Sequence, residues 1–236
     1  MLCHVANLYV DIPTAGGMDF RCKDYICREH RVADIVIDAE KYRRKVYPET
    51  LSEEDIVYLE SGWQFYAKLI EFGGLMLHAS AVELDGKAYL FSGPCGMGKS
   101  THTRLWQQAF GEKAQIFNDD KPALRREDGR WYAYGTPWCG KDGINQNRRI
   151  PLAGICFLKR GQENIIRRLD EKDVIAQVLY QTLHQFKSTE RIEPLLDSLG
   201  KLVREIPVFE LQNLPEEAAA RLSYETMSCA AKEIGL

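Results

Sequence analysis

One stretch of the sequence has the residue types and the spacing that can hold a chain of phosphates. It fits the pattern G-x-x-x-x-G-K-[ST] and consists of Gly93, Pro94, Cys95, Gly96, Met97, Gly98, Lys99 and Ser100. Glycines let a backbone wrap around an anion with its N–H groups turned inward. A lysine at this place reaches the β- and γ-phosphate oxygens, and a serine hydroxyl ligates Mg²⁺. The pattern therefore predicts a nucleoside triphosphate site in which Lys99 binds phosphate, Ser100 binds the metal and Thr101 borders the ligand.

The surroundings of this pattern agree with that chemistry. The apolar segment 88–91 comes just before it and predicts a β-strand, and residues 100–110 have the periodicity of a helix with one apolar face. The N-terminus of such a helix adds a positive dipole end to the anion site. The alternative is a glycine-rich turn without function, which the flanking strand and helix disfavour. Cys95 is interpreted as a small residue that fits beside the phosphates.

Two adjacent carboxylates follow further along the chain. Asn118, Asp119 and Asp120 come after the short apolar segment 115–117, which predicts a strand. Carboxylates at a strand end would lie near the metal and the γ-phosphate, where one can bind Mg²⁺ and the other can accept a proton from an attacking hydroxyl. Alone, the segment would be interpreted as a surface turn rich in Asn and Asp. The phosphate-binding pattern nearby favours the chemical interpretation.

Two further features admit both a structural and a functional interpretation. His78 lies within the apolar segment 75–81, so it is either a core histidine with its hydrogen bonds satisfied or a side chain that faces the carboxylates and tunes their pKa. Residues 134–141 combine Gly, Pro and Trp, which indicates an ordered loop. Lys141 in that loop either contacts phosphate or is a surface cation, and Arg148-Arg149 follow shortly after.

The elements that must position these residues divide the chain into two parts. Residues 1–50 are rich in turns and short apolar segments, which predicts a small β-rich N-terminal lobe. Residues 51–236 then form the nucleotide-binding domain. Its first helix is expected to begin after Ser52 as N-cap and to end at Gly73-Gly74. The buried positions expected from its periodicity are Ile56, Leu59, Trp63, Tyr66 and Ile70.

The rest of residues 51–236 is predicted to form strands and helices in alternation. Strands are predicted over 75–82 and 88–91, joined by a turn at Asp85-Gly86. The other predicted strands cover 115–117, 123–126, 131–134, 152–158, 165–169 and 208–211, and the other predicted helices 171–186, 191–205 and 216–231. Short turns join several of these strands, so we expect an α/β fold with a mixed sheet.

Composition excludes several classes of protein. The chain has 236 residues, a net charge of −3, 45% hydrophobic and 28% charged residues, which is typical of a globular domain. That charge gives no reason to expect nucleic acid or a membrane as a partner. No signal peptide or membrane-spanning stretch is recognisable, so we expect a cytoplasmic location. Seven cysteines are interpreted as reduced thiols, and the spacing of Cys22, Cys27 and His30 does not predict a metal site. Homo-oligomer formation is left open.

These motifs together resemble the HPr serine kinase family, which is related in its nucleotide-binding fold to the ATP-type phosphoenolpyruvate carboxykinases. That family has a histidine one β-hairpin before the phosphate loop and an Asp-Asp pair after the loop helix, which match His78 and Asp119-Asp120. The resemblance implies a P-loop core of that type and a catalytic set of His78, Lys99, Asp119 and Asp120. It further implies Asp119 as the base, and Ser100 and Asp120 as Mg²⁺ ligands. Thr101 stands where true HPr kinases usually carry an acid, and HPr itself is not implied as the substrate.

The sequence therefore predicts an ATP- and Mg²⁺-dependent kinase that phosphorylates a hydroxyl, with a serine of a peptide or protein as the favoured acceptor. A small-molecule hydroxyl is an alternative, because the residues do not define an acceptor pocket. A second alternative is a nucleotide-dependent binding or switch module with slow hydrolysis, in which Asp119 would serve only the metal.

Overall fold

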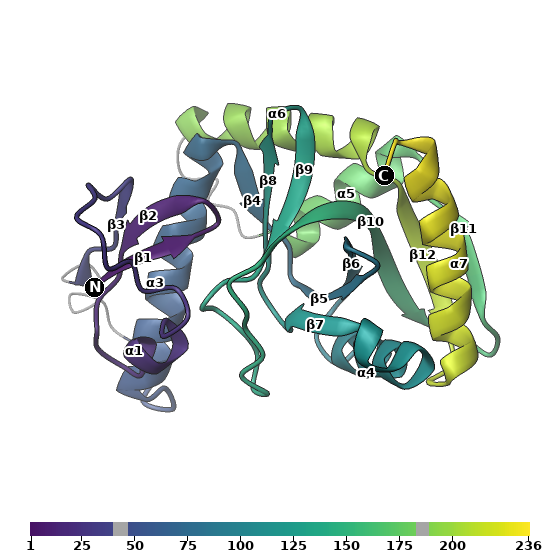
Figure 1. The fold of residues 1–236 in the computed structure, drawn as a ribbon, viewed down its shortest axis with the longest axis horizontal. Helices are drawn as coiled ribbons and strands as arrows, with labels where there is room; N and C mark the ends of the chain where they lie inside the picture. Colours follow the sequence, from purple (N-terminus) through teal and green to yellow (C-terminus); the bar gives the residue numbers. More distant parts are fainter. Residues whose placement is uncertain (40–46, 183–188) are drawn as a thin grey trace.

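The first 39 residues form a small three-stranded sheet. The computed structural model describes residues 1–39, 47–182 and 189–236. Strands β1 (Leu2–Val5) and β2 (Leu8–Asp11) form an antiparallel hairpin, and β3 (Ile35–Val36) pairs with β2 in parallel. Ala6 and Asn7 connect the hairpin with φ of 50° and 58°, the left-handed backbone that a two-residue turn requires. The four-residue helix α1 (Met18–Arg21) completes this part, which lies beside α3 in Figure 1.

Helix α3 (Glu53–Leu69) begins where the sequence predicts. The Ser52 hydroxyl accepts from the Asp55 N–H, and the Asp55 carboxylate accepts from the Ser52 N–H, so both halves of a capping box are present. The 3₁₀ turn η1 (Ile70–Phe72) follows, and Gly73 ends it with φ of 69°.

The buried face of α3 differs from the predicted one. Tyr66 and Ile70 are buried as expected, but Leu59 is 47% exposed, and Val57 and Phe65 are also buried. The reason is that α3 packs against two partners at once. Its buried residues share one hydrophobic cluster with the N-terminal sheet on one side and with Trp138 on the other.

The main sheet has nine strands and is mixed, as predicted. Its order is β4-β8-β9-β10-β6-β5-β7, with β12 beside β10 and β11 beside β12. The strands are β4 (Gly74–Met76), β5 (Ala79–Leu84), β6 (Lys87–Ser92), β7 (Gln115–Asn118), β8 (Ala123–Glu127), β9 (Arg130–Tyr134), β10 (Arg149–Arg160), β11 (Ile165–Arg168) and β12 (Val208–Asn213). Strands β6, β10 and β12 run parallel, and the other pairs are antiparallel.

Two features of the strand pairing accompany the curled shape of this sheet (Figure 1). Strand β10 pairs first with β9 and then with β6 and β12, so it passes from one half of the sheet to the other. The predicted strand 75–82 is in fact two strands, because β4 pairs with β8 whereas β5 pairs with β6 and β7. The chain changes partners at Leu77-His78, which brings His78 to the junction of the two halves.

Helices cover both faces of the main sheet. They are α4 (Lys99–Phe110), the 3₁₀ turn η2 (Gly111–Lys113), α5 (Glu171–Gln181), α6 (Thr189–Glu205) and α7 (Glu217–Glu233). Along β6, Tyr89 and Phe91 join the core with α4 and α7, whereas Ala88 and Leu90 join the core with α5 and α6. This alternation follows from the two-residue period of a strand. In the described part of the chain, no helix has both the length and the apolar character that a membrane crossing demands.

We predict that the N-terminal sheet and the rest of the chain unfold together. Ile12 is fully buried in the cluster that also contains Val57, Phe65 and Trp138. Ile12→Ala should lower the free energy of unfolding by about 2–5 kcal/mol, because it leaves a cavity in that shared core. The measurement is urea unfolding followed by tryptophan fluorescence and by far-UV circular dichroism. All four tryptophans lie beyond residue 50, so the fluorescence comes from the second part, in which Trp138 also belongs to the shared cluster.

Both signals should shift by the same amount in Ile12→Ala. A shift in circular dichroism with an unchanged fluorescence transition would show instead that residues 1–39 unfold as a separate domain.

Candidate functional site

The loop between β6 and α4 has a backbone that only glycine adopts without strain. Gly93, Gly96 and Gly98 have φ of 150°, 76° and 96°. Gly98 precedes α4 without a side-chain cap, so the first N–H groups of the helix are left for another acceptor. A Cβ on Gly93 would lie 3.3 Å from the Leu158 carbonyl oxygen, so this end of the loop packs close against β10. Residues 94–96 are exposed, which leaves the loop open to a ligand.

Lys99 is turned inward at the base of this loop. Its side chain is buried, and its Nζ donates to the carbonyl oxygens of Gly93 at 2.9 Å and Pro94 at 3.3 Å. Burial lowers the pKa of Lys99, and the charge of Asp120 acts in the opposite direction. Ser100 is half-buried in the first turn of α4, and Thr101 is exposed. The structure therefore holds a buried cation where the sequence predicts one for phosphate.

The chain turns sharply after β7, and the Asn118 side chain holds that turn. Its Oδ1 accepts from the N–H groups of Asp120 at 3.2 Å and Lys121 at 2.8 Å, and its Nδ2 donates to the Thr136 carbonyl at 3.1 Å. Because of this turn, Asp119 and Asp120 do not alternate across a strand. Each carboxylate has partners of its own.

Asp120 is paired with two cationic or titratable groups. Its Oδ1 lies 3.2 Å from His78 Nε2, and its Oδ2 forms an ion pair with Lys121. Burial raises the pKa of Asp120, but the hydrogen bond from His78 and the charge of Lys121 outweigh it and hold this pKa well below its usual range. The Tyr58 hydroxyl accepts from Lys121 Nζ at 2.7 Å and donates to the Cys139 carbonyl at 2.9 Å. Asp120 is therefore ionised at any physiological pH.

Asp119 has the opposite electrostatic character. It is only 6% exposed, and its Oδ1 accepts from the Gly140 N–H at 2.6 Å. Burial raises the pKa of Asp119, the hydrogen bond from Gly140 lowers it, and the neighbouring charge of Asp120 raises it further, so the net shift is upward. The backbone of Gly140 comes so close that a Cβ there would lie 3.0 Å from Asp119 Oδ2. The two carboxylates thus differ in basicity.

His78 connects the acidic pair to helix α5 and to the loop strand. Its Nδ1 lies 3.0 Å from Gln181 Oε1, and its backbone N–H donates to the Gln181 carbonyl at 2.9 Å. The Ser92 hydroxyl, one residue before Gly93, donates to the His78 carbonyl at 2.8 Å. Of the two interpretations of His78, the geometry agrees with the one in which the ring faces a carboxylate.

Residues 134–141 form a packed loop that supports Asp119. Thr136, Trp138 and Cys139 are buried. The Trp138 ring stacks on Phe65 with centroids 4.7 Å apart, and its Nε1 donates to the Ser61 hydroxyl at 3.1 Å. Lys141, which follows Gly140, is exposed.

The two arginines that follow this loop pair with carboxylates elsewhere in the fold. Arg148 forms an ion pair with Glu83, and Arg149 pairs with Glu127 at 3.1 Å. Neither belongs to the candidate site.

Several residues of the site were not predicted from the sequence. Tyr58, Lys121 and Gln181 contact the acidic pair or His78 directly. Arg21 arrives from the N-terminal lobe, where its guanidinium lies 4.7 Å from the Tyr58 ring centroid and donates to Cys139 Sγ at 3.3 Å. Lys121 has a signal in the sequence, because it directly follows the Asp-Asp pair. Nothing in the sequence marks Arg21, which folding brings in from a distant segment.

Cys22, Cys27 and His30 do not form a cluster in the structure. Cys22 is fully buried beside Cys3, and Cys27 Sγ contacts the Glu29 carbonyl at 3.7 Å. Over residues 1–39, 47–182 and 189–236, no three His, Cys, Asp or Glu side chains gather as they would around a metal ion.

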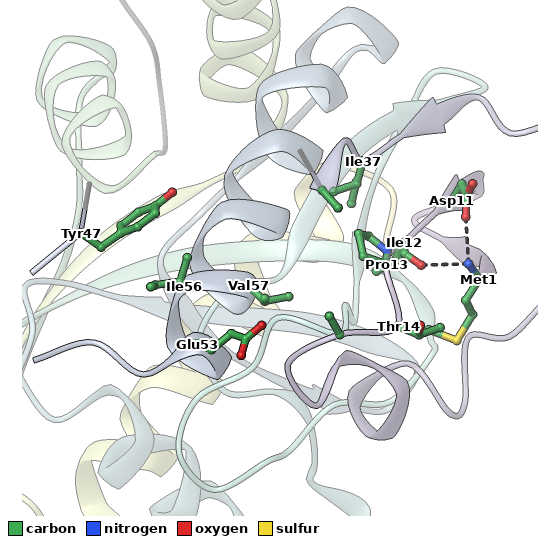
Figure 2. Close-up of a pocket in the computed structure, with 12 residues that line it drawn as sticks. Met1, Asp11, Ile12, Pro13, Thr14, Ile37, Tyr47, Glu53, Ile56 and Val57 are labelled. Carbon is green, nitrogen blue, oxygen red and sulfur yellow. Dashed lines mark hydrogen bonds and ion pairs between the residues drawn. The ribbon is translucent and has the colours of Figure 1, made fainter. Parts of the chain in front are cut away.

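A cavity of about 580 Å³ lies between the N-terminal lobe and α3, as Figure 2 shows. Its wall includes Ile12, Ile37, Ile56 and Val57, and the Met1 ammonium beside it pairs with Asp11 at 2.9 Å. None of the residues predicted for the nucleotide site lines this cavity.

Comparison with known proteins places the chain in a family. The family described as SynChlorMet cassette protein ScmC matches residues 49–215, well over half of the chain. The chain belongs to the ScmC family. The match covers the loop, the acidic pair and His78, whereas most of the N-terminal lobe lies outside it.

Other comparisons add little to this assignment. The chain is similar to the solved structure of the HPr(Ser) kinase/phosphatase from Coxiella burnetii, with 12% identity and a TM-score of 0.36 over 67% of this chain and 95% of that one. A TM-score this low does not establish a common fold. No curated protein matches the chain.

We predict opposite pH dependence for the two carboxylates. The lowered pKa of Asp120 means that its ionisation stabilises the fold above about pH 4 and that this stabilisation is lost as the pH falls. Asp120→Asn should therefore lower the free energy of unfolding at pH 7. The difference in free energy of unfolding between this variant and the wild type should become smaller in acid.

For Asp119, with its raised pKa, stabilisation by the bound proton is complete below about pH 4 and is lost as the pH rises. Asp119→Asn should raise the free energy of unfolding at pH 7.

The measurement is urea unfolding at intervals between about pH 2 and pH 7. Asp24→Asn is the control, because Asp24 is exposed. Parallel curves for Asp119→Asn and Asp120→Asn would contradict the assigned environments.

Proposed function

We propose that this ScmC-family chain is an ATP-dependent kinase that transfers the γ-phosphate to a hydroxyl, with a serine of a peptide or protein as the favoured acceptor. One observation carries the proposal. The glycine-rich loop, with Lys99 turned inward, adjoins a pair of carboxylates of unequal basicity at the same end of the sheet. The contact between Ser92 and His78 joins the two, and the charge of Asp120 acts on Lys99.

The residues present suit a nucleoside triphosphate and Mg²⁺. The loop offers backbone N–H groups at the start of α4 and a buried ammonium, which together suit several phosphate oxygens. Ser100 and Asp120 offer the oxygen ligands that Mg²⁺ prefers. When bound, Mg²⁺ neutralises charge on the β- and γ-phosphate oxygens. Because the pKa of Asp120 is held low, its carboxylate is available to the metal in ionised form.

The acceptor hydroxyl needs a base, and Asp119 has the properties of one. Its raised pKa lies closer to neutral than that of a solvated carboxylate, which favours proton transfer. As the acceptor oxygen bonds to the γ-phosphorus, its proton passes to Asp119. The bond from the γ-phosphorus to the bridging oxygen breaks, and its electrons leave with ADP. Lys99 neutralises charge on the phosphates, and His78 keeps Asp120 in place.

Lys99→Ala should remove most nucleotide-dependent activity and leave the fold intact. The loss of a charge contact that strengthens in the transition state should cost about 10²–10³-fold in rate. The measurement is ADP release with candidate acceptors present and absent, alongside circular dichroism. Lys113→Ala is the control, because Lys113 is an exposed lysine just after α4. Turnover near the wild-type rate in Lys99→Ala would exclude this loop as the nucleotide site.

Asp119→Asn should lower kcat by about 10²–10⁴-fold with nucleotide affinity nearly unchanged, because it removes the base and keeps the shape. Asp120→Asn should weaken Mg²⁺ binding instead.

Gly140→Ala should shift the position of the Asp119 carboxylate without changing its chemical group. The new methyl group would lie 3.0 Å from Asp119 Oδ2, so the carboxylate must give way by a few tenths of an ångström. Because a misplacement of about 1 Å can cost about 10²-fold in rate, this smaller shift should cost less than that.

Gly200→Ala is the control for the added methyl group, since the nearest atom there is the end of the Arg204 side chain at 3.7 Å. If phosphoryl transfer to the same acceptor proceeds at the wild-type rate in Asp119→Asn and in Gly140→Ala, Asp119 is not the base. ADP release that no acceptor accelerates would favour a nucleotide-dependent switch over a kinase.

A further inference from the structure

A second cavity, of about 540 Å³, adjoins the glycine-rich loop. Gly93, Pro94 and Met97 of the loop form one wall, and the carboxyl end of β10 at Phe157–Lys159 forms another. Helix α5 forms a third wall that includes Tyr180 and Gln181. Its volume lies within the range of small-molecule sites. No residue of the predicted nucleotide site beyond the loop itself lines it.

The position of the acidic pair sets the direction in which a bound nucleotide must run. Strand β6, which leads into the loop, has β5 on one side and β10 on the other. The carboxylates follow β7, which lies beyond β5, so the γ-phosphate end belongs on that side. The nucleoside end then extends the opposite way, toward the carboxyl end of β10. That end of β10 forms the wall of the cavity.

The side chains of the cavity suit a flat heteroaromatic ring. Met97 and Phe157 are apolar, and Tyr180 is 77% exposed, so its ring is available for stacking. The Gln177 amide adds a donor and an acceptor that can pair with the polar edge of a base.

The cavity is separated from the acidic pair, beside which the acceptor hydroxyl would have to lie. Gln181 lines the cavity, and its side chain contacts His78 on the side of the ring opposite to Asp120. A hydroxyl bound in the cavity would therefore be kept from the acidic pair by Gln181 and His78. This arrangement favours the nucleoside over the acceptor as the occupant.

We propose that this cavity binds the nucleobase of the nucleotide, with the base stacked on Tyr180 and its polar edge paired with Gln177. The proposal rests on the proposed function, since it presumes that the loop binds a triphosphate. It adds a recognition site to the phosphate-binding groups. It also assigns to α5 a role in choosing the nucleotide.

The test distinguishes the contribution of the nucleobase to binding from that of the phosphates. Binding of Mg-ATP and of inorganic tripolyphosphate with Mg²⁺ is measured by calorimetry for the wild type and for two variants of the cavity wall. Tyr180→Ala removes the stacking ring and should weaken ATP binding by about 5- to 100-fold. Ala176→Trp fills the cavity from α5 and should weaken ATP binding at least about 10-fold. Tripolyphosphate should bind both variants as it binds the wild type.

Lys172→Trp is the matched control, because it adds the same side chain at an exposed position of α5 that does not line the cavity. Wild-type ATP affinity in both Tyr180→Ala and Ala176→Trp would overturn the proposal. A loss of phosphoryl transfer with ATP affinity unchanged would overturn it too and would assign the cavity to the acceptor. If the wild type binds neither ATP nor tripolyphosphate, the proposed function fails first, and the nucleobase site fails with it.

Discussion

The candidate site depends on one buried side chain, Asn118. Its amide oxygen holds the backbone N–H groups of Asp120 and Lys121, and its amide nitrogen holds the Thr136 carbonyl. In a regular strand, Asp119 and Asp120 would point to opposite faces of the sheet. The turn at Asn118 instead directs Asp119 toward Gly140 and Asp120 toward His78, so the fold gives two identical carboxyl groups different environments.

The difference between the carboxylates comes from segments far apart in the chain. Asp120 is held by His78, which lies where the chain passes from β4 to β5, and by Lys121, which Tyr58 of α3 orients. Among the residues that the structure describes, no cation pairs with Asp119, which is buried and accepts a hydrogen bond from the Gly140 backbone. A carboxylate with a low pKa suits a metal ligand, and one with a raised pKa suits a base. The curled sheet is required because it brings the segments that carry His78, Lys121 and Tyr58 together at the acidic pair.

The sequence predicts the local features well and the long-range ones poorly. The phosphate-loop pattern, the Ser52 cap and the Asp-Asp pair are short motifs whose physical reasons lie within a few residues. The single strand predicted over 75–82 is wrong, because the break at His78 depends on β4 pairing with β8. Periodicity places Leu59 in the core, but α3 packs against two partners, and Leu59 is exposed. Arg21 and Gln181 reach the site only through the tertiary fold.

We infer that the loop and the acidic pair act on one nucleotide. A crystal structure with Mg²⁺ and a non-hydrolysable ATP analogue would show whether they do. We expect the triphosphate along the Gly93–Ser100 loop, with Lys99 on the γ-phosphate, the metal held by Ser100 and Asp120, and Asp119 facing the γ-phosphorus. A triphosphate bound away from this loop, or a γ-phosphate directed away from Asp119 and Asp120, would contradict it.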